Sequence, residues 1–286
     1  MKKTARSSGR RRRHRNDAGN AVALTIAGSD PGGGAGLQAD LKTFAALGVY
    51  GYSAITAVIA QNSSTVNRVA LVAPAMIAAQ IETLAAERLP DAIKTGALGS
   101  AGIVEAVADS ISRLDLPAPV VDPVLISSAG VRLLDLAGQR GLLRRLLPLA
   151  RIVTPNLAEA QALTGVDGAS PAALRAMALA LTAAGTRAVL IKGGHVLSQS
   201  RGESREESTD LFYDGREFVE LRAARIPGGG AHGLGCALSA AIAAYLAQGM
   251  ELLEAVRQAK RYVSAALRAR FRLGAGRAVL DHFVRK

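Results

Sequence analysis

A single cysteine stands at the end of a glycine-rich segment. Residues Pro227–Cys236 read P-G-G-G-A-H-G-L-G-C and continue into the apolar stretch Ala237–Tyr245, which has the composition of a buried helix. Glycines before a helix N-terminus allow backbone N–H groups to converge on an anion, and the helix dipole favours negative charge there. The segment therefore predicts a phosphate site; the alternative is a flexible loop that merely precedes a helix.

Cys236 itself has the chemistry of a proton acceptor. At the start of a helix, the dipole is expected to lower the pKa of the thiol. A thiolate there could take the proton of an attacking hydroxyl while neighbouring amides stabilise charge on a transferred phosphoryl group. The alternative is a small, buried helix residue. Because the chain has one cysteine, it forms no internal disulfide, which is typical of a reducing compartment.

A second glycine-rich turn precedes two further polar candidates. Gly28–Asp40 reads G-S-D-P-G-G-G-A-G-L-Q-A-D, and such a turn lets a ligand approach the backbone closely. Asp40 falls near the apolar stripe of the following helix, so its carboxylate needs a partner, either as a structural cap or as a ligand contact. Gln61 offers a donor and an acceptor side by side, which suits a pyrimidine edge but equally suits a loop.

Oxygen-bearing side chains follow several short apolar runs. Asp122, Asn156 and Glu159 suit Mg²⁺ held partly through water and nucleotide phosphates. Lys192 would add positive charge near those phosphates. The four histidines lack the spacing of zinc ligands, and no G-x-x-x-x-G-K-[ST] motif occurs. A G-x-G-x-x-G match at Gly228 lies far from the first strand-to-helix turn, where a dinucleotide fold would have it.

The elements that must position these residues alternate between strand and helix. Helical spacing follows the first strand, a helix begins at Pro74, and two helices are expected at about Ala237–Gln248 and Glu251–Arg270. Alternating elements predict an α/β fold with a mostly parallel central sheet and helices on both faces, so ligands bind at the carboxyl ends of the strands. The expected strands are Val22–Ala27, Tyr52–Ala60, Ala92–Thr95, Val120–Val124, Ile152–Thr154 and Ala188–Ile191, with a hairpin at Asp210–Tyr213 and Phe218–Leu221.

Composition predicts a single domain over residues 21–286 behind a disordered basic tail at residues 1–20. Hydrophobic residues make up 49% of the chain and charged residues 20%, which allows a large apolar core. The tail carries eight Lys or Arg against one Asp, and it has no apolar periodicity. It is either an arm for nucleic acid, acidic surfaces or targeting, or a solvated start; we favour the second. We expect a cytoplasmic homo-oligomer with no membrane helix or export signal and no nucleic-acid partner.

The ordered motifs from about Val22 to Phe283 together resemble the hydroxymethylpyrimidine and phosphomethylpyrimidine kinases of thiamine synthesis, which are ribokinase-like. The motifs are T-I-A-G-S-D-P-G-G-G-A-G-L-Q-A-D-L-K-T-F, A-Q-N, K-T-G-A-L, V-V-D-P-V, V-T-P-N-L-A-E-A, K-G-G-H, H-G-L-G-C-A-L-S-A-A and L-D-H-F. The resemblance implies phosphorylation of 4-amino-5-hydroxymethyl-2-methylpyrimidine and of its monophosphate, with ATP and Mg²⁺.

The resemblance also implies roles for individual residues. Cys236 resembles the catalytic base, with Gly233 and Gly235 in the anion hole. The residues that resemble the pyrimidine pocket are Gly28, Ala35, Asp40, Gln61, Ala97 and Val124. Those that resemble the Mg²⁺–ATP side are Asp122, Asn156, Glu159 and Lys192, with Asp122 and Glu159 on the metal.

Several positions depart from the family pattern, and other functions stay open. The usual N-T-H-G-T-G-C has Gly230, Ala231 and Leu234 in place of its amide and two hydroxyls. If those hydroxyls contact phosphate, restoring them would strengthen the site; alternatively, Leu234 packs under the loop. Ser128 and Ala129 replace Lys and Ser, and Ala97 replaces Met. The alternatives are a pyridoxine or pyridoxal kinase and a non-catalytic pyrimidine sensor.

Overall fold

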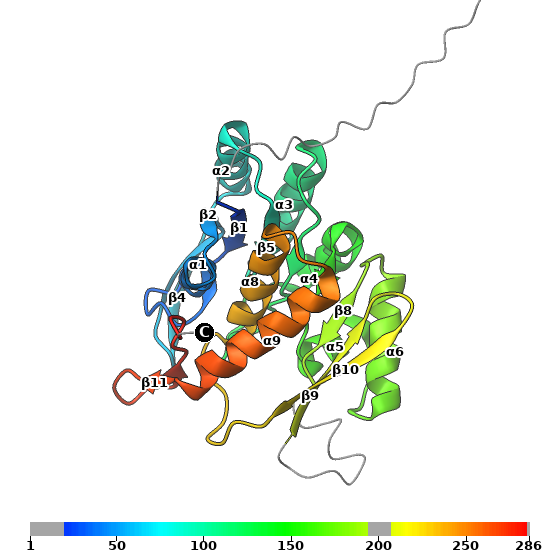
Figure 1. Cartoon of the computed structure of the whole chain (residues 1–286). Helices are drawn as coiled ribbons and strands as arrows, with labels where there is room; N and C mark the ends of the chain where they lie inside the picture. Colours follow the sequence, from blue (N-terminus) through cyan, green and yellow to red (C-terminus); the bar gives the residue numbers. More distant parts are fainter. Residues whose placement is uncertain (1–19, 194–206, 285–286) are drawn as a thin grey trace, which may run out of the picture.

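The computed structural model describes residues 20–193 and 207–284 and contains one large sheet (Figure 1). In space its strands follow the order β10-β9-β8-β7-β6-β5-β1-β2. Neighbours from β2 to β8 run parallel, and β9 and β10 add an antiparallel hairpin at one edge. The strands are β1 (Val22–Ala27), β2 (Tyr50–Ile55), β5 (Ala92–Thr95), β6 (Val120–Val121), β7 (Ile152–Val153), β8 (Val189–Ile191), β9 (Glu207–Tyr213) and β10 (Phe218–Ala224).

Helices cover both faces of this sheet, as the alternating pattern predicts. One apolar cluster packs α2 (Pro74–Glu87), α3 (Ala101–Arg113), α5 (Leu157–Thr164) and α6 (Pro171–Ala183) against one face, and α4 (Leu136–Gly141) lies beside α3. A second cluster packs α1 (Gly36–Ala46), α8 (Leu234–Ala247) and α9 (Leu252–Arg268) against the other. A π-helix, Leu142–Leu146, and a 3-10 turn, Leu147–Leu149, continue α4.

Helix α8 is the central element of the second face. Its residues from Ala237 to Tyr245 are all buried, and α9 runs across it (Figure 1), so α8 lies between the sheet and α9. A helix that is apolar all round requires such cover on every side. The amphipathic α9 buries only one side, with Ala255, Val256 and Ala259 among its buried residues. The start of α8 is thereby held rigidly at the edge of the sheet.

The predicted strand Tyr52–Ala60 is wrong as a single element. It breaks at Thr56, whose backbone N–H donates to Ala27 and whose hydroxyl donates to the carbonyl of Ala97 at 2.6 Å. These bonds turn the chain out of the main sheet. Its continuation, β3 (Ala57–Gln61), pairs instead with β4 (Val66–Leu71) in a separate antiparallel ribbon, and β4 was not predicted.

The parallel strands deliver their following turns to the same edge. β1 is flanked by β2 on one side and β5 on the other, so the chain reverses direction across the sheet at the β1–β5 boundary. Such a switch point leaves a crevice beyond the carboxyl ends of the strands. A short pair, β11 (Phe271–Arg272) and β12 (Ala278–Val279), borders this edge, and the His232 N–H donates to Ala278 at 2.8 Å.

Two predictions concern segments beyond this description. The basic tail lies outside the described residues except for Asn20, as do the last two positions of K-G-G-H.

Among the described residues, no helix is both long and apolar enough to cross a membrane.

Candidate active site

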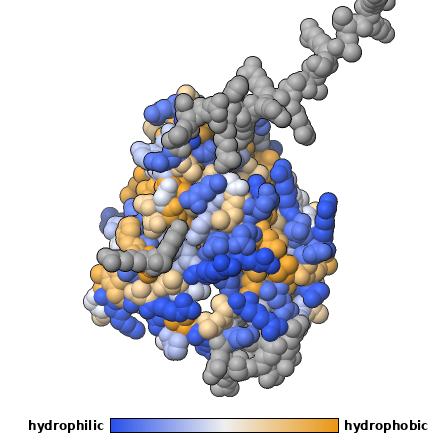
Figure 2. Space-filling model, viewed as in Figure 1, coloured by the Kyte–Doolittle hydropathy of each residue, from blue (hydrophilic) through white to orange (hydrophobic). Residues whose placement is uncertain are grey.

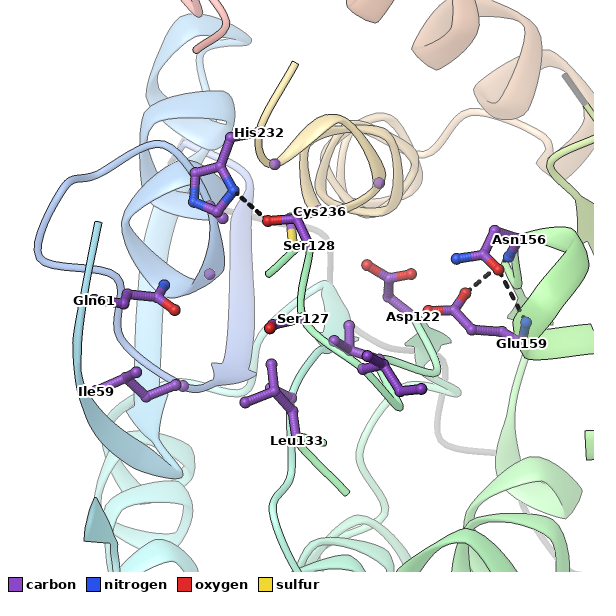
Figure 3. A pocket seen from close by; sticks show the side chains of 18 of the residues that line it. Ile59, Gln61, Asp122, Ser127, Ser128, Leu133, Asn156, Glu159, His232 and Cys236 are labelled. Carbon is purple, nitrogen blue, oxygen red and sulfur yellow. Dashed lines mark hydrogen bonds between the residues drawn. The ribbon is translucent and has the colours of Figure 1, made fainter. Parts of the chain in front are cut away.

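One cavity opens at the carboxyl ends of the parallel strands (Figure 3). It is enclosed by the first turn of α8, by the strand β3 and by the turns that follow β1, β5, β6, β7 and β8. Every residue predicted for the site, Asp40 excepted, lines this cavity: Gly28, Ala35, Gln61, Ala97, Asp122, Val124, Asn156, Glu159, Lys192, Gly233, Gly235 and Cys236. The structure thus brings together residues as far apart in the sequence as Gly28 and Cys236.

The first glycine-rich turn is organised by Asp30, which the sequence reasoning did not single out. Its buried carboxylate accepts backbone N–H groups from Gly32 at 3.1 Å, Gly34 at 3.1 Å and Ala35 at 2.7 Å. The turn is folded around this one side chain. An aspartate at the entrance of a glycine-rich turn is the local signal that could have identified it.

Asp30 also joins the two glycine-rich segments through His232. The Nε2 atom of His232 lies 3.0 Å from Asp30 Oδ2, and its Nδ1 atom lies 3.0 Å from the hydroxyl of Ser128 (Figure 3). Burial raises the pKa of Asp30, but hydrogen bonds from His232 and the Ala35 backbone outweigh burial, so the pKa is lowered overall. Ser128, one of the departures from the family pattern, thus bonds to the loop that precedes α8.

Gly233 is the point of closest approach between these two segments. It has a φ of 81° and forms the N-cap of α8. A Cβ atom at this position would lie 1.8 Å from the carbonyl oxygen of Gly34 and 2.9 Å from Ala35 Cα. Only glycine satisfies both the left-handed backbone and the contact. The N-terminus of α8 therefore lies directly against the β1–α1 turn.

Cys236 lies in the first turn of α8, with its side chain at the cavity (Figure 3). The expectation that the helix dipole lowers its thiol pKa is wrong. Burial raises the pKa to about 12; Lys94 acts against burial, whereas Asp122 and Asp40 add to it. Because desolvation penalises the thiolate more than the helix N-terminus stabilises it, the thiol is neutral here at neutral pH.

Asp122 and Lys192 form the charged part of the cavity. Lys192 Nζ lies 3.2 Å from Asp122 Oδ1, and the hydroxyl of Ser239 donates to Asp122 Oδ2 at 3.3 Å. A Cβ atom on Gly235 would lie 3.1 Å from Lys192 Nζ. The ammonium group therefore stands directly against the first turn of α8, where backbone donors and a lysine converge on the same space.

Asn156 and Glu159 hold the start of α5 in a capping box. The Asn156 side chain accepts the Glu159 N–H at 2.9 Å, and Glu159 Oε2 accepts the Asn156 N–H at 2.8 Å (Figure 3). Burial raises the pKa of Glu159 to about 7, Asp122 acts in the same direction, and Lys192, 3.9 Å away, acts against them. Both residues thus have a structural role, and a Glu159 carboxylate remains beside Lys192.

Asp40 does not line the cavity, because a lysine stands between them. The Oδ2 atom of Asp40 accepts Lys94 Nζ at 2.7 Å and the Thr25 hydroxyl at 2.6 Å, and all three residues are fully buried. Of this group, only Lys94 reaches the cavity wall. The sequence reasoning overlooked Lys94 because it lies within the apolar strand β5; a charged residue in such a strand is the signal.

Gln61 belongs to the wall made by the β3–β4 ribbon. Gln61 and Ile59 are two positions apart on β3, so their side chains share a face. Figure 3 shows them side by side along the cavity, on the opposite side from Asp122 and Glu159. Ile59, Leu133 and Ile126 supply apolar surface, and Gln61 supplies an amide among them.

A second cavity adjoins the first at Asn156, Lys192 and Gly235, which line both. Its apolar wall comes from α8 and α9 through Leu234, Leu238 and Val263. Its polar wall includes the ion pair between Lys260 and Asp210, 2.7 Å apart. Leu234 also packs against the apolar cluster under α8, which favours the packing alternative for this departure from the family pattern.

Comparisons with known proteins agree with this geometry. The family model for phosphomethylpyrimidine kinase matches residues 30–281. A hydroxymethylpyrimidine/phosphomethylpyrimidine kinase of Rhizobium meliloti is 47% identical over 268 residues, covering 93% of this chain and 98% of the relative.

Solved structures show the same architecture. The pyridoxal kinase of Staphylococcus aureus in complex with ADP has a TM-score of 0.83 at 36% identity, covering 93% of this chain and 94% of that one. A phosphomethylpyrimidine kinase of Clostridium difficile has a TM-score of 0.74 at 37% identity, covering 86% and 98%. The ribokinase-like fold that the motifs imply is confirmed, and the chain belongs to the phosphomethylpyrimidine kinase family.

Proposed function

We propose that this protein uses ATP to phosphorylate 4-amino-5-hydroxymethyl-2-methylpyrimidine and then its monophosphate. The observation that carries the proposal is the meeting of two cavities at Lys192 and Gly235. One has an amide, Gln61, on an apolar wall, which suits a small polar ring; the other has an apolar wall of α8 and α9, which suits a nucleotide base. The phosphates of ATP would then lie at the start of α8.

The proposed reaction transfers the γ-phosphoryl group to the hydroxymethyl oxygen. The hydroxyl oxygen forms a bond to the γ-phosphorus, the bond from that phosphorus to the bridging oxygen breaks, and ADP leaves. Cys236 accepts the hydroxyl proton, while the backbone N–H groups of Gly233 and Gly235 stabilise the charge on the phosphoryl oxygens. Since the carboxylate of Asp122 raises the pKa of this thiol, a cation at Asp122 would favour the thiolate.

The carboxylates of Asp122 and Glu159 fit a magnesium ion. Among the described residues, no cluster of three His, Cys, Asp or Glu side chains could hold a metal by itself. Mg²⁺ is usually held by one or two carboxylates together with water and substrate phosphates, so a pair of carboxylates beside the phosphate region meets its preference. Bound there, the ion would neutralise phosphate charge. The structural neighbours in complex with ADP and with AMP-PCP support the use of ATP.

The two phosphorylation steps make different demands on Cys236. The alcohol must lose a proton, whereas a phosphate monoester is already largely deprotonated above its second pKa of about 6. Cys236→Ala should therefore lower turnover of the alcohol by about 10²- to 10⁴-fold, the usual effect of removing a positioned base. Turnover of the monophosphate should fall much less.

The test measures ATP consumption with the alcohol, its monophosphate and pyridoxal in parallel, for wild type and Cys236→Ala. Binding of the pyrimidine to both proteins, measured by calorimetry, controls for damage to the pocket. Turnover of pyridoxal in preference to both pyrimidines would overturn the proposed substrate. Normal turnover of the alcohol by Cys236→Ala would show that another group is the base.

A further inference from the structure

Lys94 is a buried charge that the proposed reaction does not yet use. It lies on β5 between β1 and β6, it is 0% exposed, and it lines the inner wall of the cavity. A buried ammonium group requires a counter-charge, because its desolvation is costly. Within residues 20–193 and 207–284, the hydrogen bonds give Lys94 Nζ a single acceptor, Asp40 Oδ2.

The counter-charge is itself incompletely satisfied. Asp40 Oδ2 accepts both Lys94 and Thr25, whereas Oδ1 is buried without a hydrogen-bond partner among the described residues. An unpaired carboxylate oxygen in the interior is destabilising. The pair thus leaves one buried carboxylate oxygen unsatisfied, and its lysine borders a cavity. The geometry therefore indicates that Lys94 has a task on its cavity side.

Cys236 is the group on which Lys94 acts. Lys94, Cys236 and Gly36 line the same cavity. Cys236 lies in the first turn of α8 and Gly36 is the first residue of α1, so two helix N-termini stand at the wall that holds the thiol. The charges of Lys94 and Cys236 interact strongly enough for each to shift the pKa of the other: the lysine lowers that of the thiol, and the thiolate raises that of the lysine.

Other charged groups face the thiol from the surrounding elements. Asp122, after β6, and Asp40, on α1, both disfavour the thiolate. Lys192, after β8, also interacts with it but is paired with Asp122 at 3.2 Å. In the part of the chain that the structure describes, the hydrogen-bond acceptor of Lys94 is Asp40, which does not line the cavity.

We propose that Lys94 is a positioning residue for phosphoryl transfer, holding from beneath the cavity the positive charge that stabilises the thiolate form of Cys236. This inference rests on the proposed role of Cys236 as the base. The thiolate accepts the proton of the substrate hydroxyl and becomes a neutral thiol, and Lys94 then returns to its pairing with Asp40 alone. No other reactant is required.

The test measures how fast iodoacetamide alkylates the thiol of the intact protein at several pH values. Because Cys236 is the only cysteine in the chain, all thiol alkylation reports on this site. Lys94→Met should slow the reaction, because the pKa of the Cys236 thiol rises. Each unit of that rise reduces the thiolate fraction about tenfold, but the remaining thiolate is more nucleophilic, so the alkylation rate falls only about threefold. Asp40→Asn should speed it up, because Lys94 then loses its competing counter-charge.

The opposite signs separate charge from packing. Both substitutions break the same buried ion pair, so loosening of the pocket would change the two alkylation rates in the same direction. A common direction, or no change in either variant, would overturn the inference. If Lys94→Met does not fold, as judged by circular dichroism, Lys94→Gln, which keeps a polar head group without the charge, takes its place, and alkylation of that variant that is unchanged or faster overturns the inference.

The two assignments are tested by separate measurements. Alkylation needs neither substrate nor ATP, whereas the base is tested by turnover of Cys236→Ala. If that variant turns over the alcohol normally while the two alkylation rates diverge, Lys94 controls the thiol but has no part in phosphoryl transfer, and the inference fails together with the assignment of the base. If the variant is inactive and the alkylation rates do not diverge, Cys236 remains the base and the inference about Lys94 fails.

Discussion

Replacing Glu159 by Gln tests the electrostatics of the charged part of the cavity. The pKa of this buried carboxyl is raised from its ordinary 4.5 to about 7. The folded protein therefore binds this proton more tightly than the unfolded chain does. This tighter binding adds to the free energy of unfolding; the contribution is complete below about pH 4.5 and is lost as the pH rises through about 7. The difference between the two pKa values amounts to about 3 kcal/mol in the free energy of unfolding.

Gln removes the titration but keeps the cap, because its side-chain oxygen can still accept the N–H of Asn156. The assay is urea unfolding at about pH 5 and about pH 8 in buffer without divalent cations, followed by circular dichroism. At each pH, we compare the free energy of unfolding of Glu159→Gln with that of wild type. The variant's value minus the wild-type value should be about 2 to 3 kcal/mol larger at pH 8 than at pH 5.

Glu105→Gln, on the exposed side of α3, is the matched control and should show no such dependence on pH. If the stability difference between Glu159→Gln and wild type is the same at both pH values, then Glu159 is ionised in the folded protein throughout this range. The account of its burial beside Asp122 would then be refuted.

Three further predictions concern the walls of the two cavities. Gln61→Ala should weaken pyrimidine binding by about 1 to 3 kcal/mol and leave ATP binding nearly unchanged in calorimetry; equal losses for both ligands would contradict its place on the pyrimidine wall. Gly233→Ala should lose turnover and melt at a lower temperature, because its Cβ would lie 1.8 Å from the carbonyl oxygen of Gly34. Gly230→Ala is the control: its Cβ would have no atom within 4 Å, so it should behave as wild type in both measurements. Leu234→Thr should weaken ATP binding by about 1 kcal/mol through lost apolar contact, and a gain would show that a hydroxyl is favoured there.

The parallel sheet and its cavity could be predicted because their signals are local. A strand buried on both faces is a short apolar run, and a turn residue after each run marks the edge where ligands bind. Asp122 after β6 and Lys192 after β8 were therefore recognised at once. The break at Thr56 could not be, because it depends on bonds to Ala27 and Ala97, which only the folded chain brings near.

The electrostatics of the site could not be predicted for a similar reason. The position of Cys236 at a helix N-terminus is visible in the sequence, but the balance between that dipole and burial depends on Asp40 and Asp122. Lys94 reads as part of an apolar strand, and its partner Asp40 is 54 residues away. His232 and Ser128 are 104 residues apart, so the network that joins their loops is likewise invisible before folding.

The departure of the β3–β4 ribbon from the main sheet has an evolutionary consequence. Gln61 and Ile59 stand on this ribbon, whereas Asp122, Lys192 and Cys236 are anchored by the sheet and α8. Figure 2 shows hydrophilic residues across the centre of one face of the molecule, with hydrophobic residues beside them. The cavity wall with Gln61 and the wall with Asp122 belong to different supports. Under the proposed function, mutations in the ribbon therefore reshape the wall beside the pyrimidine and leave the residues at the start of α8 in place. The ring that is bound can then evolve separately from the transfer of the phosphoryl group.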